Sequence, residues 1–234
     1  MLNPADSRNF YRTFQALALI IAPLLLLVGA LIDASTFPAF DYAERLPQIR
    51  ANADLFLPFN FMYLVAPLAM VPGGLGLIHL VRGARITLGE VGGWLFVLGT
   101  MVSLVLTGFG AVEYELATTR AVSPEVAVKM VESARAGLIT AVLLTFVVTS
   151  GVGAILLAIG TWRRGVLPVW MATTLALSGP LGAVPNKWVT VVSVVLQSIA
   201  LSAAGRQLLR MSDARFENWE PLQPAPRHAA ATTH

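Results

Sequence analysis

The sequence contains no cysteine among its 234 residues. Disulfides, thiolate metal ligands and a cysteine nucleophile are therefore excluded. Histidine is almost as scarce, because only His79, His228 and His234 are present, and the last two belong to a polar C-terminal segment. We also find no phosphate-binding loop, dinucleotide fingerprint or hydrolase motif. The sequence thus predicts neither a bound metal nor a cofactor.

Charged residues are also few, at 12% of the chain, whereas 56% of the residues are apolar and the mean hydropathy is +0.71. Soluble domains carry roughly 25% charged residues. A soluble chain of this length could not bury so much apolar surface, because its own surface would have to be apolar. The composition predicts an integral membrane protein of the all-α class. We expect membrane lipids, and no nucleic acid, as partners despite the net charge of +3.

Six stretches lack Asp, Glu, Lys and Arg and predict six transmembrane helices, because one span needs about 20 mostly apolar residues. A β-barrel is excluded, since its strands would alternate polar and apolar residues over about 10 positions. We expect a polytopic membrane helix bundle over residues 1–211 and a flexible cytoplasmic tail over residues 212–234. The six predicted spans are residues 13–32, 58–81, 91–112, 137–160, 166–185 and 187–205.

The distribution of Lys and Arg predicts the orientation of the bundle. With the N-terminus inside, ten of the 16 Lys and Arg residues lie on the cytoplasmic side and six lie outside. The tight turns with Arg82 and Arg85, and with Arg163 and Arg164, count most, because short loops follow the positive-inside rule best. The pattern predicts a multi-pass protein of the cell membrane with both termini in the cytoplasm.

Two regions align without gaps and suggest repeated helical hairpins. Pro47 precedes Gly74 by the same number of residues as Pro124 precedes Gly151. Gly76, Ile78 and Leu80 then match Gly153, Ile155 and Leu157 in the same register. The alternative is that apolar helices share Gly, Ile and Leu by chance. Both prolines are also predicted to begin short helices outside the membrane, since proline is favoured at the first helical position.

The third predicted span carries a stripe of small residues that ends in a carboxylate. At 100° per residue, one narrow face holds Gly92, Gly99, Ser103, Leu106, Gly110 and Glu113, whereas Glu115 falls on the opposite side. Small residues let helices approach closely in lipid, so this face is predicted to point into the bundle. Glu113 is then a candidate general acid or base, together with Asp33 at the end of the first span. The alternative is that both carboxylates are ordinary helix-end charges in contact with water.

Further polar residues are candidates for ligand binding. Asn60, Glu115, Arg135 and Lys187 are predicted near the outer boundary, where they could line a polar pocket. Gln197 is predicted at mid-membrane, in a stripe with Thr190, Ser193, Ala200 and Ala204, where an amide also serves to hold helices together. Near the cytoplasmic face, His79, Arg82 and Arg85 are candidates for contacts with a lipid headgroup, or else are solvated.

The segments VAPLAMVPGGLGLIHLVRG and GEVGGWLFVLGT, within residues 64–83 and 89–116, resemble a group of small bacterial membrane proteins of unknown function that is abundant in actinobacteria. The resemblance covers the first four predicted spans. It implies a protein of the bacterial inner membrane. It implies no activity and transfers no site residues.

Three classes of function remain open. A non-enzymatic binding, accessory or sensory bundle is favoured and predicts a packed core, with a second copy of the chain or another membrane subunit as a partner. A small enzyme acting on an isoprenoid or another lipid predicts an apolar pocket with Glu113 or Asp33 at its polar end. A transporter predicts a water-accessible path and paired interrupted helices.

Overall fold

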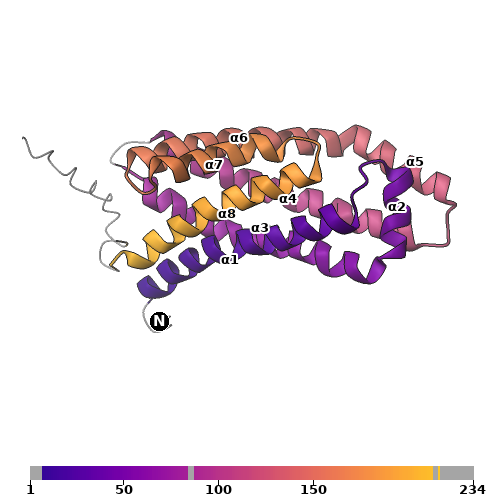
Figure 1. Cartoon of the computed structure of the whole chain (residues 1–234), viewed down its shortest axis with the longest axis horizontal. Helices are drawn as coiled ribbons and strands as arrows, with labels where there is room; N and C mark the ends of the chain where they lie inside the picture. Colours follow the sequence, from indigo (N-terminus) through magenta and orange to yellow (C-terminus); the bar gives the residue numbers. More distant parts are fainter. Residues whose placement is uncertain (1–6, 84–86, 213–215, 217–234) are drawn as a thin grey trace, which may run out of the picture.

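The computed structural model describes residues 7–83, 87–212 and 216, and every regular element in this part of the chain is a helix. Figure 1 shows most of these helices running along one long axis. The helices are α1 (Ser7–Thr36), α2 (Tyr42–Ala51), α3 (Ala53–Val81), α4 (Leu88–Thr118), α5 (Pro124–Ala134), a π-helical turn (Arg135–Ile139), α6 (Thr140–Arg163), α7 (Val169–Gly182) and α8 (Lys187–Arg210).

The long helices form a closed ring. Each of α1, α3, α4, α6, α7 and α8 packs mainly against the helix before it and the helix after it in this order, and α8 closes the ring against α1. Short α2 lies across one end of the ring, in contact with α3, α4 and α5 (Figure 1). We name this end the α2 end. At the opposite end, the His79 end, α1 begins and α8 finishes.

Five helical stretches are long and apolar enough to cross a membrane, as in a multi-pass membrane protein. They are Asn9–Thr36, Ala53–Val81, Leu88–Thr118, Pro124–Arg163 and Lys187–Arg210. The prediction of six spans is not confirmed, because α7 has only 14 residues and is about 21 Å long at 1.5 Å per residue. This helix begins after Pro168 and ends two residues after Pro180, and the chain is non-helical on both sides of it.

The two proline-led helices at the α2 end differ from each other. Pro124 begins α5 as predicted, and the Ser123 hydroxyl accepts a hydrogen bond from the backbone N–H of Val126. The prediction for Pro47 is wrong, because α2 already begins at Tyr42, where the Asp41 carboxylate caps the helix and makes a proline start unnecessary. Helix α5 is joined to α6 across a kink at Gly137, where the backbone leaves the helical conformation, whereas Asn52 separates α2 from α3. The predicted hairpin repeat is thus not confirmed.

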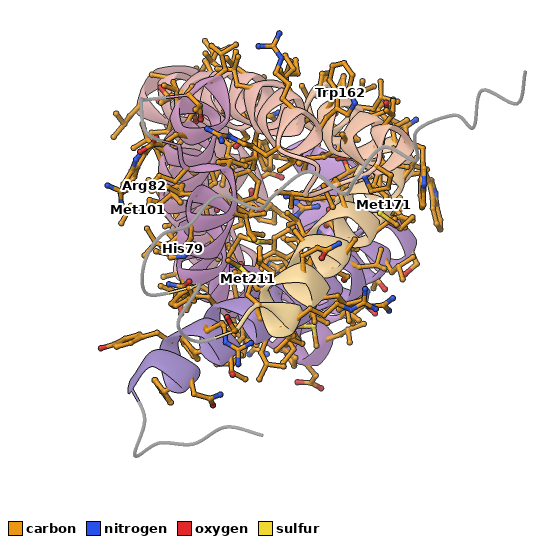
Figure 2. The ribbon with its side chains drawn as sticks, turned by 90° about the vertical axis from the view of Figure 1, so that its left-hand side faces the viewer. His79, Arg82, Met101, Trp162, Met171 and Met211 are labelled. Carbon is orange, nitrogen blue, oxygen red and sulfur yellow. The ribbon has the colours of Figure 1, made fainter. Side chains whose placement is uncertain are left out.

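The His79 end is closed by close packing. Its core includes the fully buried side chains of Leu19, Leu77, Leu157 and Leu208. Helices α4 and α6 touch backbone to backbone, since a Cβ atom on Gly160 would lie 2.2 Å from the Cα atom of Gly89. Figure 2 views the molecule from this end and labels His79 and Met211 there.

The end of α8 is held by a buried arginine from α1. The Arg12 guanidinium donates hydrogen bonds to the carbonyl oxygens of Leu208, Leu209 and Met211 at 3.2, 2.8 and 2.6 Å. These carbonyls lie in the last turn of the helix, where helical N–H donors run out, and Leu208 O also accepts a hydrogen bond from the Met211 N–H at 3.2 Å. Beyond α8, the Phe216 ring stacks on the His79 ring at 4.0 Å. Of the predicted flexible tail, residues 212–234, the structure describes Ser212 and Phe216, and the rest lies outside the described residues.

Candidate functional site

Four charged side chains from four helices meet at the α2 end. Arg45 of α2 is the centre: its Nε donates to Glu113 Oε2 of α4 at 3.2 Å, and its Nη1 donates to Asp33 Oδ1 of α1 at 3.2 Å. Lys187, the first residue of α8, donates to the same Asp33 oxygen at 3.0 Å. Both cations also donate to the carbonyl oxygen of Phe37. We call Asp33, Arg45, Glu113 and Lys187 the ion network.

The ion network is neutral as a whole and largely shielded from solvent. It holds two cations and two carboxylates, and the side chain of Glu113 is only 8% exposed. Burial would lower the pKa of Arg45, but Glu113 and Asp33 outweigh this effect and raise it. Each buried charge therefore has a partner, which is the condition under which ion pairs persist in a low-dielectric environment.

Tyr42 of α2 is a neighbour of the ion network. It lies beside Glu113, and burial together with the negative charge of Glu113 raises the pKa of Tyr42 to about 12. The guanidinium carbon of Arg135 lies 5.4 Å from the centre of the Tyr42 ring, within the range of a cation–π interaction. Arg135 thus stacks on the Tyr42 ring and does not line the cavity that is described next.

A cavity of about 370 Å³ extends from the ion network into the ring of helices. Asp33, Arg45 and Glu113 form its charged end, and apolar side chains such as Phe59, Met70 and Leu106 form much of its wall. Small-molecule sites occupy roughly 300–1,000 Å³ and combine apolar walls with a few polar groups. A cavity of this kind differs from the packed core that we expected of an accessory bundle.

The cavity is long and narrow. On α4 its wall runs from Phe96 to Glu113, which corresponds to about 25 Å of helix at 1.5 Å per residue. On α3 it runs from Phe56 to Met70, or about 21 Å. A volume of about 370 Å³ spread over this length suits a chain-like molecule better than a round one.

The small residues of α4 have the role that the sequence suggested. Gly92 and Gly99 meet α6, where added Cβ atoms would lie 2.4 Å from Leu157 N and 2.3 Å from Ser150 Oγ. Further along the helix, Gly110 makes room for Asn60, whose Oδ1 would lie 2.6 Å from such a Cβ atom. The stripe thus brings helices together in its first half and opens the cavity in its second half.

A proline in α3 shapes the adjoining wall. Pro67 has no N–H, so the carbonyl oxygen of Tyr63, four residues earlier, has no helical donor. The Thr107 hydroxyl on α4 lies 3.0 Å from that oxygen and can donate to it, or to its own helix at Ser103. The interrupted helix is thereby joined to its neighbour at the level of the cavity.

The cavity reaches the surface where α7 is short. Gly179 of α7 packs on α6, because a Cβ atom there would lie 2.7 Å from the Cα atom of Gly151. Beyond this contact α7 ends at Gly182, and the exposed residues Gly182 and Ala183 line the cavity opposite Val147 of α6. Exposed apolar side chains lie on α6 and on the turn before it, among them Leu144 of α6 and Leu138 of the turn. We call this opening between α6 and the end of α7 the lateral mouth.

The remaining predicted site residues are distributed as follows. Asn60 and Gln197 line the cavity, and Lys187 lies behind Asp33 without lining it. Glu115 is exposed and points away from Glu113, as the helical pattern predicted. His79 is buried against Phe216, Arg82 is exposed, and Arg85 lies outside the described residues.

Arg45 of the ion network and its neighbour Tyr42 were not among the predicted site residues. Arg45 and Tyr42 belong to α2, which lies outside the long apolar stretches on which the sequence analysis concentrated. The sequence contained a signal for Arg45, because two carboxylates that are predicted at the same level near the membrane boundary need cations close to them. Arg45 lies on the loop that joins the first two predicted spans on that side.

Within residues 7–83, 87–212 and 216, no group of three or more His, Cys, Asp or Glu side chains is placed to hold a metal ion. The chemical capacity of the site therefore rests on a chain-shaped cavity, a neutral ion network at one end and amides along the wall. Comparisons with protein families, with curated proteins and with solved structures each find no match to this chain.

Proposed function

We propose that this protein binds one elongated, mainly apolar small molecule, which enters from the lipid through the lateral mouth. The observation that carries the proposal is the long cavity, with apolar walls and a single charged end. An apolar chain fits its length, and the polar end gives such a molecule one preferred direction. Membrane lipids and other lipid-soluble molecules are thus the ligand class.

Binding is better supported than catalysis. An isoprenoid- or lipid-modifying enzyme would use Glu113 or Asp33 as a general acid or base. Both carboxylates are instead engaged by Arg45, and Asp33 also by Lys187. Carboxylate oxygens that already accept hydrogen bonds from protein cations are less available to contact a reacting group. The network therefore serves to close the end of the cavity and to orient the ligand.

The membrane setting is part of the proposal. From Arg12 to Asp33, α1 covers about 31 Å at 1.5 Å per residue, which matches a hydrocarbon core of about 30 Å. The ion network then lies at one membrane boundary, and α7 with its non-helical flanks acts as a short sixth span. The excess of Lys and Arg at the His79 end supports an orientation with this end in the cytoplasm of a cell.

The proposal is tested by native mass spectrometry of the full chain after mild extraction, with identification of the molecules that remain bound. Ala183→Trp places an indole in the lateral mouth, whereas Val184→Trp changes a neighbouring exposed residue that does not line the cavity. We expect the unmodified protein and Val184→Trp to retain one lipid-soluble molecule per chain. Ala183→Trp should lose at least about 90% of it. Equal retention by both variants, or no retained molecule in any of them, would contradict the proposal.

A further inference from the structure

The wall of the cavity carries two amide side chains. Asn60 of α3 and Gln197 of α8 both line the cavity. In the described part of the chain, neither side chain makes a hydrogen bond. An amide offers two N–H donors and one carbonyl acceptor. A polar group taken out of water without a partner costs free energy, so these groups are expected to meet water or a ligand.

The charged groups at the end of the cavity are in the opposite situation. Each member of the ion network already has an oppositely charged partner within 3.2 Å. An anionic ligand head would compete with Asp33 and Glu113 for Arg45, and a cationic head would compete with Arg45 for the carboxylates. Either head would leave one buried charge of the protein uncompensated, which is strongly unfavourable.

We infer that the ligand carries a neutral, hydrogen-bonding head such as a hydroxyl or a carbonyl group, and that Asn60 and Gln197 recognise it. This inference rests on the proposed function, because it names the head group of the molecule that the cavity takes up. It excludes fatty acids, phosphorylated lipids and amines as preferred ligands.

The position of Asn60 supports a role in recognising the head group of the ligand. Gly110 lies beside the Asn60 amide, and Glu113 is one helical turn further along α4. A head group bonded to Asn60 therefore lies just inside the ion network, without entering it. Gln197 is about 15 Å further along α8 than Lys187. It is thus placed to bond a second neutral group deeper in the ligand.

The inference is tested with three probes that share one saturated 14-carbon chain and differ only in the head: the alcohol, the sulfonate and the primary ammonium. Their affinities for the full chain in nanodiscs are compared at pH 7 by native mass spectrometry with displacement. We expect the alcohol to bind at least tenfold more tightly than either ionic probe. Asn60→Leu should weaken alcohol binding about fivefold, as should Gln197→Leu, because each removes one hydrogen bond of about 1 kcal/mol. Gln207→Leu, the same change on α8 away from the cavity, should leave binding unchanged.

A charge-changing variant separates recognition from folding. Asn60→Asp adds a carboxylate without a fixed cation and should shift the preference from the alcohol to the ammonium probe. A merely structural role of Asn60 would weaken all three probes alike, and this result would overturn the inference. Tighter binding of an ionic probe by the unmodified protein would also overturn the inference. The proposed function, binding in the cavity, would not be contradicted by that result. Failure of all three probes to bind would instead overturn the proposed function.

Discussion

The two ends of the helical ring are closed by different interactions. At the His79 end, buried leucines and glycine contacts fill the centre, and Arg12 caps the end of α8. At the α2 end, the ring surrounds a cavity, and the closure consists of the ion network with an aromatic cluster around Phe37 and Phe56. The ring is thus closed by close packing at one end, whereas ion pairs join α1, α4 and α8 through α2 at the other.

This difference explains how a small bundle can keep an open interior. Close packing needs helices that approach each other, and the glycine contacts of α4 with α6 provide this near the His79 end. At the α2 end the helices surround the cavity, and long side chains such as Arg45 and Lys187 connect them. Ion pairs of low solvent exposure hold four helices without filling the space between them.

The largest effect is expected when the central cation of the α2 end is removed. Arg45→Ala leaves Glu113 without its cation in a site of low exposure, which should lower the free energy of unfolding by about 3–5 kcal/mol. Thermal and denaturant unfolding of the purified protein in a mild detergent measures this loss. Arg120→Ala, which removes an exposed arginine near the same end, should change stability by less than about 0.5 kcal/mol. Equal stability of the two variants would mean that the network does not hold the α2 end together.

A smaller contrast is expected between two leucine truncations. Leu157 is fully buried at the His79 end, so Leu157→Ala creates a new void and should cost about 2–5 kcal/mol. Leu106 borders the existing cavity, so Leu106→Ala enlarges a space that is already open and should cost about 1 kcal/mol or less. The same unfolding measurements compare the two variants. A cost for Leu106→Ala as large as that for Leu157→Ala would show that the α2 end is closely packed.

The positions of the helices, and the side of each helix that faces the bundle, could be predicted from the sequence because both follow from local patterns. Long apolar stretches identified the five membrane-length helices of the described chain, and the helical angle placed Glu113 and Glu115 on opposite sides of α4. The helix lengths were less predictable, since α7 is shortened by Pro168 and by the region after Pro180, although the whole stretch lacks charge. The cavity and the role of Arg45 depend on how four distant segments meet, and no local pattern contains this information.

The smallest expected effect concerns pH and sharpens the comparison of the two ends. The pKa of Tyr42 is raised from 10 to about 12, so the folded protein holds the phenolic proton more tightly than the unfolded chain does. The resulting stability is fully present below about pH 10 and is lost as the pH rises towards 12. Spectrophotometric titration should show one tyrosine with this pKa, absent in Tyr42→Phe, and the free energy of unfolding should fall less steeply over this pH range in that variant.

Tyr11, an exposed residue near the start of α1 at the His79 end, provides the matched control. Tyr11→Phe should leave both the transition near pH 12 and the fall in stability unchanged. If Tyr42→Phe retained the full pH dependence, the sensitivity would have to come from groups outside the Tyr42–Glu113 contact. The α2 end would then not be the pH-sensitive end of the bundle. The two ends would not differ in how their stability responds to pH.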